Sequence, residues 1–138
     1  MGTSTDAILF YGFCLPEDSE ENDLCEDYED IYAKVCGFPE PTSDYHNNME
    51  VHELYWEHKK SLLLASECGI DAHCSGDYPM YFVYFSKSKI INSRGDNTII
   101  TKNTLNVEDH WNMSIKDFCD KLKITYAEPA WNLVSYWG

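Results

Sequence analysis

The chain has 138 residues and a net charge of −14, and 43% of its residues are hydrophobic and 14% aromatic. This composition excludes an intrinsically disordered chain, and the length is that of one domain able to bury a single core. The acidity argues against direct binding to nucleic acid or to an anionic membrane and favours basic partner proteins. The sequence therefore predicts one folded domain, residues 1–138.

No export signal is recognisable in the sequence. The apolar stretch at residues 7–15 is too short to span a membrane and has no basic flank. The cysteines are therefore expected to be reduced thiols in a cytoplasm, although their even number leaves a disulfide framework open. They are Cys14, Cys25, Cys36, Cys68, Cys74 and Cys119.

The first predicted element is a strand at residues 7–15, which is apolar on both faces as in a central strand and ends at Pro16. From residue 23 the apolar residues recur with a helical period, and Gly37 ends this first helix. Its apolar stripe consists of Leu24, Tyr28, Ile31, Tyr32 and Val35.

A second helix is predicted from a cap at Asn47 or Asn48 to about Ser66, with Gly69 marking its end. Its period of apolar residues separates an inner from an outer face. The expected inner face is Val51, Leu54, Tyr55, His58 and Leu62, and the expected outer residues are Glu53, Glu57, Lys59 and Lys60.

A β-hairpin is predicted next, with strands at residues 70–74 and 80–85 joined by the turn SGDYP. The second strand is expected to continue through residues 86–92. Residues 94–97 have the composition of a turn, and residues 98–101 are predicted to form a further short strand.

A third helix is predicted to begin at Ser114, with Asp117 in a capping-box position. Its buried stripe is expected to be Ile115, Phe118, Cys119 and Leu122. The aromatic end, PAWNLVSYWG, is either an edge strand or an irregular tail. Together these elements predict an α+β domain, an antiparallel sheet of about four strands with about three helices packed on it.

The most unusual stretch is EDSEENDLCEDYED at residues 17–30, in which nine of fourteen residues are acidic and none is basic. In a helix, which rises about 1.5 Å per residue, these charges approach the density of duplex DNA, about one charge per 1.7 Å. Residues 17–22 have the composition of a loop, so a rigid acidic face is predicted from residue 23 onward. Its central members are Glu26, Asp27, Glu29 and Asp30.

Two interpretations of this acidic run remain open. It is either a solvated loop leading into an ordinary amphipathic helix, or a surface that occupies the basic site of another protein in place of nucleic acid. On the second interpretation the residues that bind the partner are Glu20, Glu21, Asp23, Glu26, Asp27, Glu29 and Asp30.

A second candidate site lies in the turn of the predicted hairpin and in the turn at residues 94–97, which are expected at the same end of the sheet, and turns often hold binding residues. Arg94 is the only arginine of the chain, and arginine suits bidentate recognition of anions. A nucleotide-type ligand is the alternative function that these turns suggest, unless their residues are simply turn formers and Arg94 pairs with a nearby acid. The candidate ligand-binding residues are His73, Ser75, Asp77, Tyr78 and Arg94.

The histidine and cysteine spacing matches no structural zinc template, so neither a metal nor another cofactor is predicted. A small hydrolase is a further alternative, using Cys74 with a distant histidine or His73 with Cys68. His73 and Cys74 cannot pair directly, because adjacent residues of a strand point to opposite faces. No oxyanion-hole signature accompanies them, so we expect a binding protein rather than an enzyme.

The aromatic C-terminus has two interpretations. It either closes over the sheet or packs against a protein partner, including a second copy of the chain. The residues concerned are Tyr126, Trp131, Tyr136 and Trp137.

Three short patches carry a resemblance: ILFYG, HCSGDYPMY followed by the turn Ser93-Arg94-Gly95, and NLVSYW. They are similar to a group of small proteins encoded by tailed bacteriophages. The resemblance implies an accessory protein that acts in the cytoplasm of an infected bacterium, in host takeover or against host defence. The expected function is thus an acidic inhibitor of a host protein with a basic, nucleic-acid-binding site.

Overall fold

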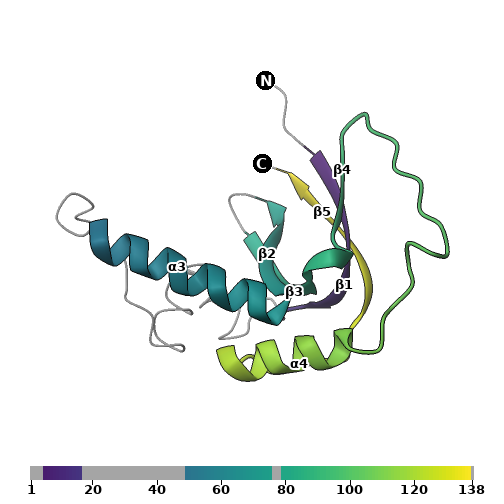
Figure 1. The fold of residues 1–138 in the computed structure, drawn as a ribbon. Helices are drawn as coiled ribbons and strands as arrows, with labels where there is room; N and C mark the ends of the chain where they lie inside the picture. Colours follow the sequence, from purple (N-terminus) through teal and green to yellow (C-terminus); the bar gives the residue numbers. More distant parts are fainter. Residues whose placement is uncertain (1–4, 17–48, 76–78, 138) are drawn as a thin grey trace.

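The structure is a computed structural model that describes residues 5–16, 49–75 and 79–137. Within these residues, five strands and two α-helices form an α+β arrangement (Figure 1). In chain order the elements are β1 (Thr5–Cys14), α3 (Met49–Ser66), β2 (Cys68–Ser75), β3 (Pro79–Phe85), the 3-10 turn η1 (Ser86–Ser88), β4 (Ile90–Ser93), α4 (Trp111–Leu122) and β5 (Ala130–Trp137).

The strands form one sheet in the order β3-β2-β5-β1-β4, and β3 also pairs with β1, so the sheet closes on itself. The central strand β1 curves along its length (Figure 1). Residues 6–9 of β1 pair with β4, and residues 12–14 pair with β3. The curvature lets one strand contact both neighbours and β5 as well.

The expectation of an antiparallel sheet of about four strands is corrected by these pairings. The sheet has five strands and is mixed, because β2 and β5 run parallel where Cys74 meets Tyr136 and Ser75 meets Trp137. β5 inserts between β1 and β2, and all eight of its residues pair with β1. The aromatic C-terminus is therefore an interior strand, neither an edge strand nor an irregular tail.

β3 and β4 behave as one strand that is interrupted by η1, which explains why a single continuous strand over residues 80–92 was expected. Gly12 pairs with Tyr84 and Leu9 pairs with Ile90. Moving three residues along β1, from Gly12 to Leu9, corresponds to moving six residues along its partner, from Tyr84 to Ile90. The three additional residues on the partner side form η1. The interruption is a large bulge in an otherwise regular ladder.

Ser88 repairs the ladder at this bulge. Its buried hydroxyl accepts a hydrogen bond from the backbone N–H of Tyr11 at 2.9 Å. The same hydroxyl donates to the carbonyl oxygen of Phe85 at 2.6 Å. A side chain therefore stands in for the backbone acceptor that the bulge removes from the centre of β1.

The main core lies between the sheet and α4. The predicted stripe of this helix is confirmed, since Ile115, Phe118, Cys119 and Leu122 are each at most 1% exposed. The helix begins at Trp111 rather than at the predicted Ser114, and His110 precedes it without a side-chain cap. Trp111 stacks on Phe85 of β3 with ring centroids 4.7 Å apart, so packing extends the helix beyond its local capping signal.

The opposite face of the sheet carries a small second core of Ile8, Phe10 and Phe82. Phe10 and Phe82 stack with ring centroids 4.1 Å apart. Val134 and Tyr136 of β5 pack against them. Both faces of β1 are therefore buried, as the apolar sequence of residues 7–15 predicts.

The range of α3 matches the predicted second helix, and its faces match only in part: Leu62 packs against the main core as expected, but other residues differ. Lys59, expected outside, is only 7% exposed, and its ammonium nitrogen lies 4.7 Å from the centre of the Trp56 ring. Leu54, expected inside, is 43% exposed, and His58 is exposed as well. The first predicted helix, from residue 23, lies outside the described residues.

The predicted strand at residues 98–101 is absent, since this part belongs to an irregular segment between β4 and α4. Thr101 and Thr104 each donate a backbone N–H to the other's hydroxyl oxygen, at 3.3 Å in both cases. Such local side-chain bonds compete with strand pairing. No helix among the described residues is long and apolar enough to cross a membrane.

Candidate functional site

The candidate partner-binding acids all lie outside the described residues, and so do Asp77 and Tyr78 of the turn cluster. The acids are Glu20, Glu21, Asp23, Glu26, Asp27, Glu29 and Asp30. Three members of the turn cluster are described, namely His73, Ser75 and Arg94.

Ser75 and Arg94 lie at the same end of the sheet, as the sequence predicts. Ser75 is the last residue of β2, and Arg94 follows the last residue of β4. Across this end, Ser75 is beside Trp137 of β5, and Ser93 of β4 is beside Asp6 of β1. β5 and β1 thus separate the two turns by three strand spacings, about 14 Å at roughly 4.8 Å each. A ligand that contacts both strand ends would have to bridge these three spacings.

His73 faces the second core rather than an open site. Its ring centre lies 5.9 Å from that of Phe82, and its Nε2 is buried with no hydrogen-bond partner among the described residues. Burial lowers the pKa of His73, because the charged ring would lose its hydration. The neutral ring therefore behaves as part of the core.

Three of the described thiols have a raised pKa and are therefore not activated nucleophiles. Cys14, Cys68, Cys74 and Cys119 are free thiols. Burial raises the pKa of Cys68 and of Cys119 to about 12, and it also raises the pKa of Cys14. These three groups remain protonated at neutral pH, whereas a nucleophilic cysteine needs a thiolate. Cys68 is accordingly unsuited to the hydrolase role considered above.

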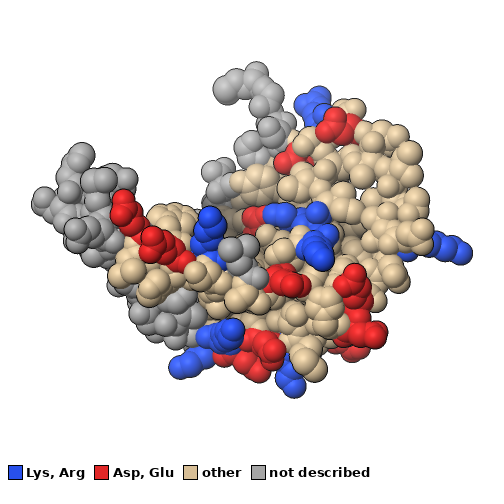
Figure 2. All heavy atoms as spheres, in the orientation of Figure 1, with Lys and Arg blue, Asp and Glu red and all other residues tan. Residues whose placement is uncertain are grey.

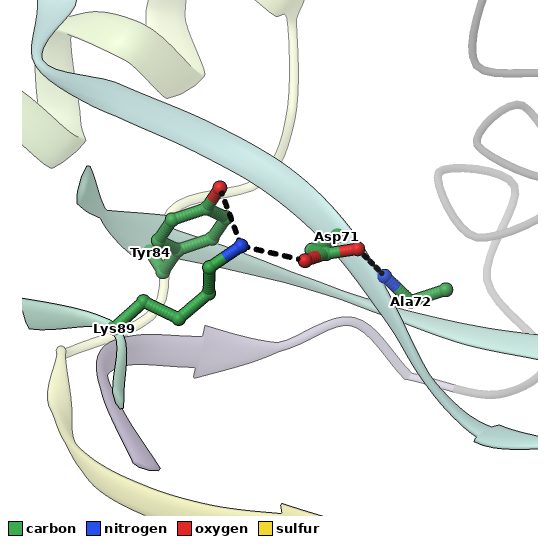
Figure 3. A network of polar contacts seen from close by, with 4 residues as sticks. All are labelled: Asp71, Ala72, Tyr84 and Lys89. Carbon is green, nitrogen blue, oxygen red and sulfur yellow. Dashed lines mark hydrogen bonds and ion pairs between the residues drawn. The ribbon is translucent and has the colours of Figure 1, made fainter. Parts of the chain in front are cut away.

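A polar network that the sequence does not signal joins β2, β3 and Lys89, which lies between η1 and β4 (Figure 3). The ammonium nitrogen of Lys89 lies 2.8 Å from a carboxylate oxygen of Asp71 and donates to the hydroxyl of Tyr84 at 3.3 Å. The other carboxylate oxygen accepts the backbone N–H of Ala72 at 2.8 Å. These residues are 18 positions apart at most, and only the sheet brings them together.

Lys89 is held in its charged form. Burial by itself would lower the pKa of Lys89, but the hydrogen bond and charge of Asp71, with Tyr84, outweigh this effect and raise it. Its ammonium nitrogen also lies 4.8 Å from the centre of the Tyr84 ring. Both charges of the network are thus satisfied, which is the property of a structural ion pair rather than of a catalytic acid or base.

A hollow of about 450 Å³ lies beside this network, between α3 and the β2–β3 hairpin. Asp71 and Tyr84 form part of its wall, and Lys59 and Leu63 of α3 form another part. Because the carboxylate already pairs with Lys89, the hollow offers binding surface without an activated group. Within the described ranges, no cluster of three or more His, Cys, Asp and Glu side chains could hold a metal ion.

The aromatic C-terminus divides between core and surface. Trp131 lies against Tyr11 and Trp111, with ring centroids 5.6 and 6.3 Å away, and Tyr136 packs on the second core. Trp137 is 53% exposed and Tyr126 36% exposed. The strand therefore closes the sheet and still leaves aromatic surface in solvent.

Charge is distributed very unevenly along the sequence. Residues 17–48 contain eleven acids and one lysine, a net charge of −10, whereas the described residues contain twelve acids and nine bases, a net charge of −3. Asp77 supplies the remaining charge of the total of −14. On the face that Figure 2 shows, acidic and basic side chains of the described residues are interspersed.

Comparison of the chain with protein-family models, curated proteins and solved structures finds no match. The resemblance to phage proteins stays a prediction, and function is argued from the chain's own residues.

Proposed function

We propose that the protein is a non-enzymatic binding protein that occupies a basic, nucleic-acid-binding site on another protein. The observation that carries this proposal is the uneven charge: −10 of the total −14 falls within residues 17–48, while the described residues are close to neutral. A charge carried for solubility alone would be spread over the surface. A concentrated one creates a directed field that attracts a basic surface.

The proposed mechanism is electrostatic competition with nucleic acid. Long-range attraction speeds the encounter with the basic partner, and short-range contacts determine how long the complex lasts. The described part of the chain contributes a stable body with two cores, to which the acidic segment is attached.

The setting we propose is the cytoplasm of a bacterium infected by a tailed phage, with the protein acting against host defence or in host takeover. The resemblance of three sequence patches to phage proteins supports this setting. The proposal of a nucleotide ligand at the turns has weaker support, since two strands, β5 and β1, lie between the strand ends at Ser75 and Arg94.

The test is capture of partners from a bacterial lysate at low and high salt, followed by displacement with DNA. We expect a complex that weakens as salt screens the charges, because the Debye length shrinks from about 10 Å at 0.1 M to about 3 Å at 1 M. DNA should displace the protein from its partner. A complex that neither salt nor DNA weakens would contradict the proposal.

A matched pair of charge-reversal variants separates position from net charge. The first variant changes Glu26, Asp27, Glu29 and Asp30 to Lys, and the second changes Glu53, Glu57, Asp117 and Asp120 to Lys. The second set is exposed on α3 and α4, and both variants change the net charge equally. Only the first should abolish binding. Equal loss in both would mean that overall acidity, rather than the segment, attracts the partner.

A further inference from the structure

An apolar groove lies on the face of the sheet that α4 covers, beyond the N-terminal end of this helix, where Trp111 meets Trp131. Its floor comes from β1, β4 and β5, where Leu9 lies between Ile90 and Leu133, and Ala7 lies beside Asn92. Its volume is about 380 Å³. The residues that line it are Ala7, Leu9, Ile90, Asn92, Thr98, Ile100, Leu105, Trp131 and Leu133.

The segment between β4 and α4 forms the wall of the groove and stands off beside the sheet (Figure 1). Two hydrogen bonds attach it to the sheet. Thr98 donates its hydroxyl to Asn92 Oδ1 at 2.7 Å, and Trp131 donates its indole N–H to the carbonyl of Leu105 at 3.0 Å. Residues 98–105, which we term the strap, therefore hold a hollow open between two fixed points.

The lining has few free hydrogen-bonding groups for a polar ligand. Its two polar side chains, Asn92 and Thr98, bond to each other, and the indole N–H of Trp131 is already donated to the strap. Among the described residues that line the groove, none is charged. A charged or strongly polar group placed inside would lose its hydration without new partners.

The same lining leaves apolar surface in water. Leu133 on the floor is 73% exposed, and Ile100 and Leu105 of the strap are 41% and 38% exposed. Apolar residues gathered in this way around a hollow are characteristic of binding sites, and 380 Å³ is within the range of about 300–1,000 Å³ for small-molecule pockets.

We propose that this groove binds a small, uncharged, apolar molecule, for which a 1-alkanol is a suitable probe. A small molecule fits this site better than the surface of a protein partner does. The strap and the sheet enclose a hollow, whereas a protein partner would need a flat, open area. None of the residues named in the lining belongs to the acidic segment, so the inference goes beyond the proposed function. Either property can fail without the other.

The test is titration of the full chain with a series of 1-alkanols from 1-hexanol to 1-decanol. The indole N–H resonance of Trp131 reports binding at the groove, and that of Trp137, at the far end of β5 and outside the groove lining, is the internal reference. Each added methylene should tighten binding about fourfold, which corresponds to about 0.8 kcal/mol per buried methylene. Octanoate should bind more weakly than 1-octanol. Absence of binding, or an affinity that does not depend on chain length, would overturn the proposal.

A matched pair of variants assigns the binding to the groove. Leu133 and Ile99 are 73% and 77% exposed, but only Leu133 lines the groove. Leu133→Gln should weaken alkanol binding about tenfold, which corresponds to half or more of the contribution of a fully buried leucine. Ile99→Gln should leave the affinity unchanged. Equal weakening by both variants would overturn the assignment.

Two further measurements complete the test. Ala7→Phe places a ring in the groove floor and should block binding, and if this variant does not fold, Leu133→Gln still decides the question. Sedimentation at the titration concentrations distinguishes a second copy as occupant. A dimer that Leu133→Gln dissociates would assign the groove to that copy and overturn the ligand proposal.

Discussion

Gly12 shows at the scale of one residue how closely the strands approach. It pairs with Ala130 of β5 on one side and with Tyr84 of β3 on the other. A Cβ atom at this position would overlap the carbonyl oxygen of Val83. Glycine is therefore required by the approach of another backbone at the point where β1 curves.

Gly12→Ala should destabilise the fold by about 3 kcal/mol, the upper part of the range for overpacking, because backbone atoms must move to relieve the overlap. Gly69→Ala is the matched control: its Cβ would lie 2.9 Å from the hydroxyl and 3.1 Å from the ring of Tyr84, so it meets a side chain rather than a backbone. We expect a smaller loss there, about 1 kcal/mol. Urea denaturation measures both, and equal losses would contradict the account of Gly12.

His73 gives the fold a dependence on acidity. Burial lowers its pKa in the folded state below the ordinary value of 6.5, so the unfolded chain binds a proton at a higher pH than the folded chain does. Above pH 6.5 the residue has no effect on stability. As the pH falls from 6.5 through the lowered pKa, the free energy of unfolding decreases, because protonation favours the unfolded chain.

His73→Gln should reduce this loss of stability on acidification, measured as the urea midpoint between pH 7 and pH 5. His110→Gln serves as the control, since His110 is exposed beside Glu67 and Glu108. If the wild type and the His73 variant lose stability equally, the buried ring is not the source of the pH dependence.

At the scale of elements, η1 separates β3 from β4, so that each pairs with a different part of β1. The 3-10 turn would leave the backbone N–H of Tyr11 without an acceptor, and the hydroxyl of Ser88 supplies one. Alternation of residues along 86–92 suggested a continuous strand, and the strand does resume at Ile90. The interruption has no separate sequence signal, because serine also suits an exposed strand or a turn.

Ser88→Ala should cost roughly 1–3 kcal/mol, since it leaves a buried N–H without a hydrogen-bond partner. Ser86→Ala, in the exposed first residue of the same turn, should change stability by less than about 0.5 kcal/mol. Urea denaturation of the two variants measures the difference. Similar losses would indicate that η1 as a whole, rather than the Ser88 hydroxyl, maintains the pairing.

At the scale of the whole molecule, the described body and the acidic segment have different physical characters. The body has balanced charges, two cores and an apolar groove, whereas the segment carries most of the net charge. The proposed partner binding belongs to the segment, and the proposed ligand binding belongs to the body. Salt should therefore weaken the first and leave the second nearly unchanged, since apolar burial is not screened.

The sequence by itself determined the α+β class, the burial of β1 on both faces, the range of α3 and the buried stripe of α4. These features rest on local periodicity, which the chain carries in consecutive residues. The uneven distribution of charge likewise follows from the order of the residues in the sequence.

Only the tertiary structure decided which segments pair. The position of β5 between β1 and β2, the bulge at Ser88, the network of Lys89 with Asp71 and Tyr84, and the groove beyond α4 all join residues from distant strands. It also kept Arg94 apart from Ser75, although both turns were expected at one end of the sheet. Pairing between distant segments depends on the summed packing of the whole chain, so no short stretch of sequence specifies it.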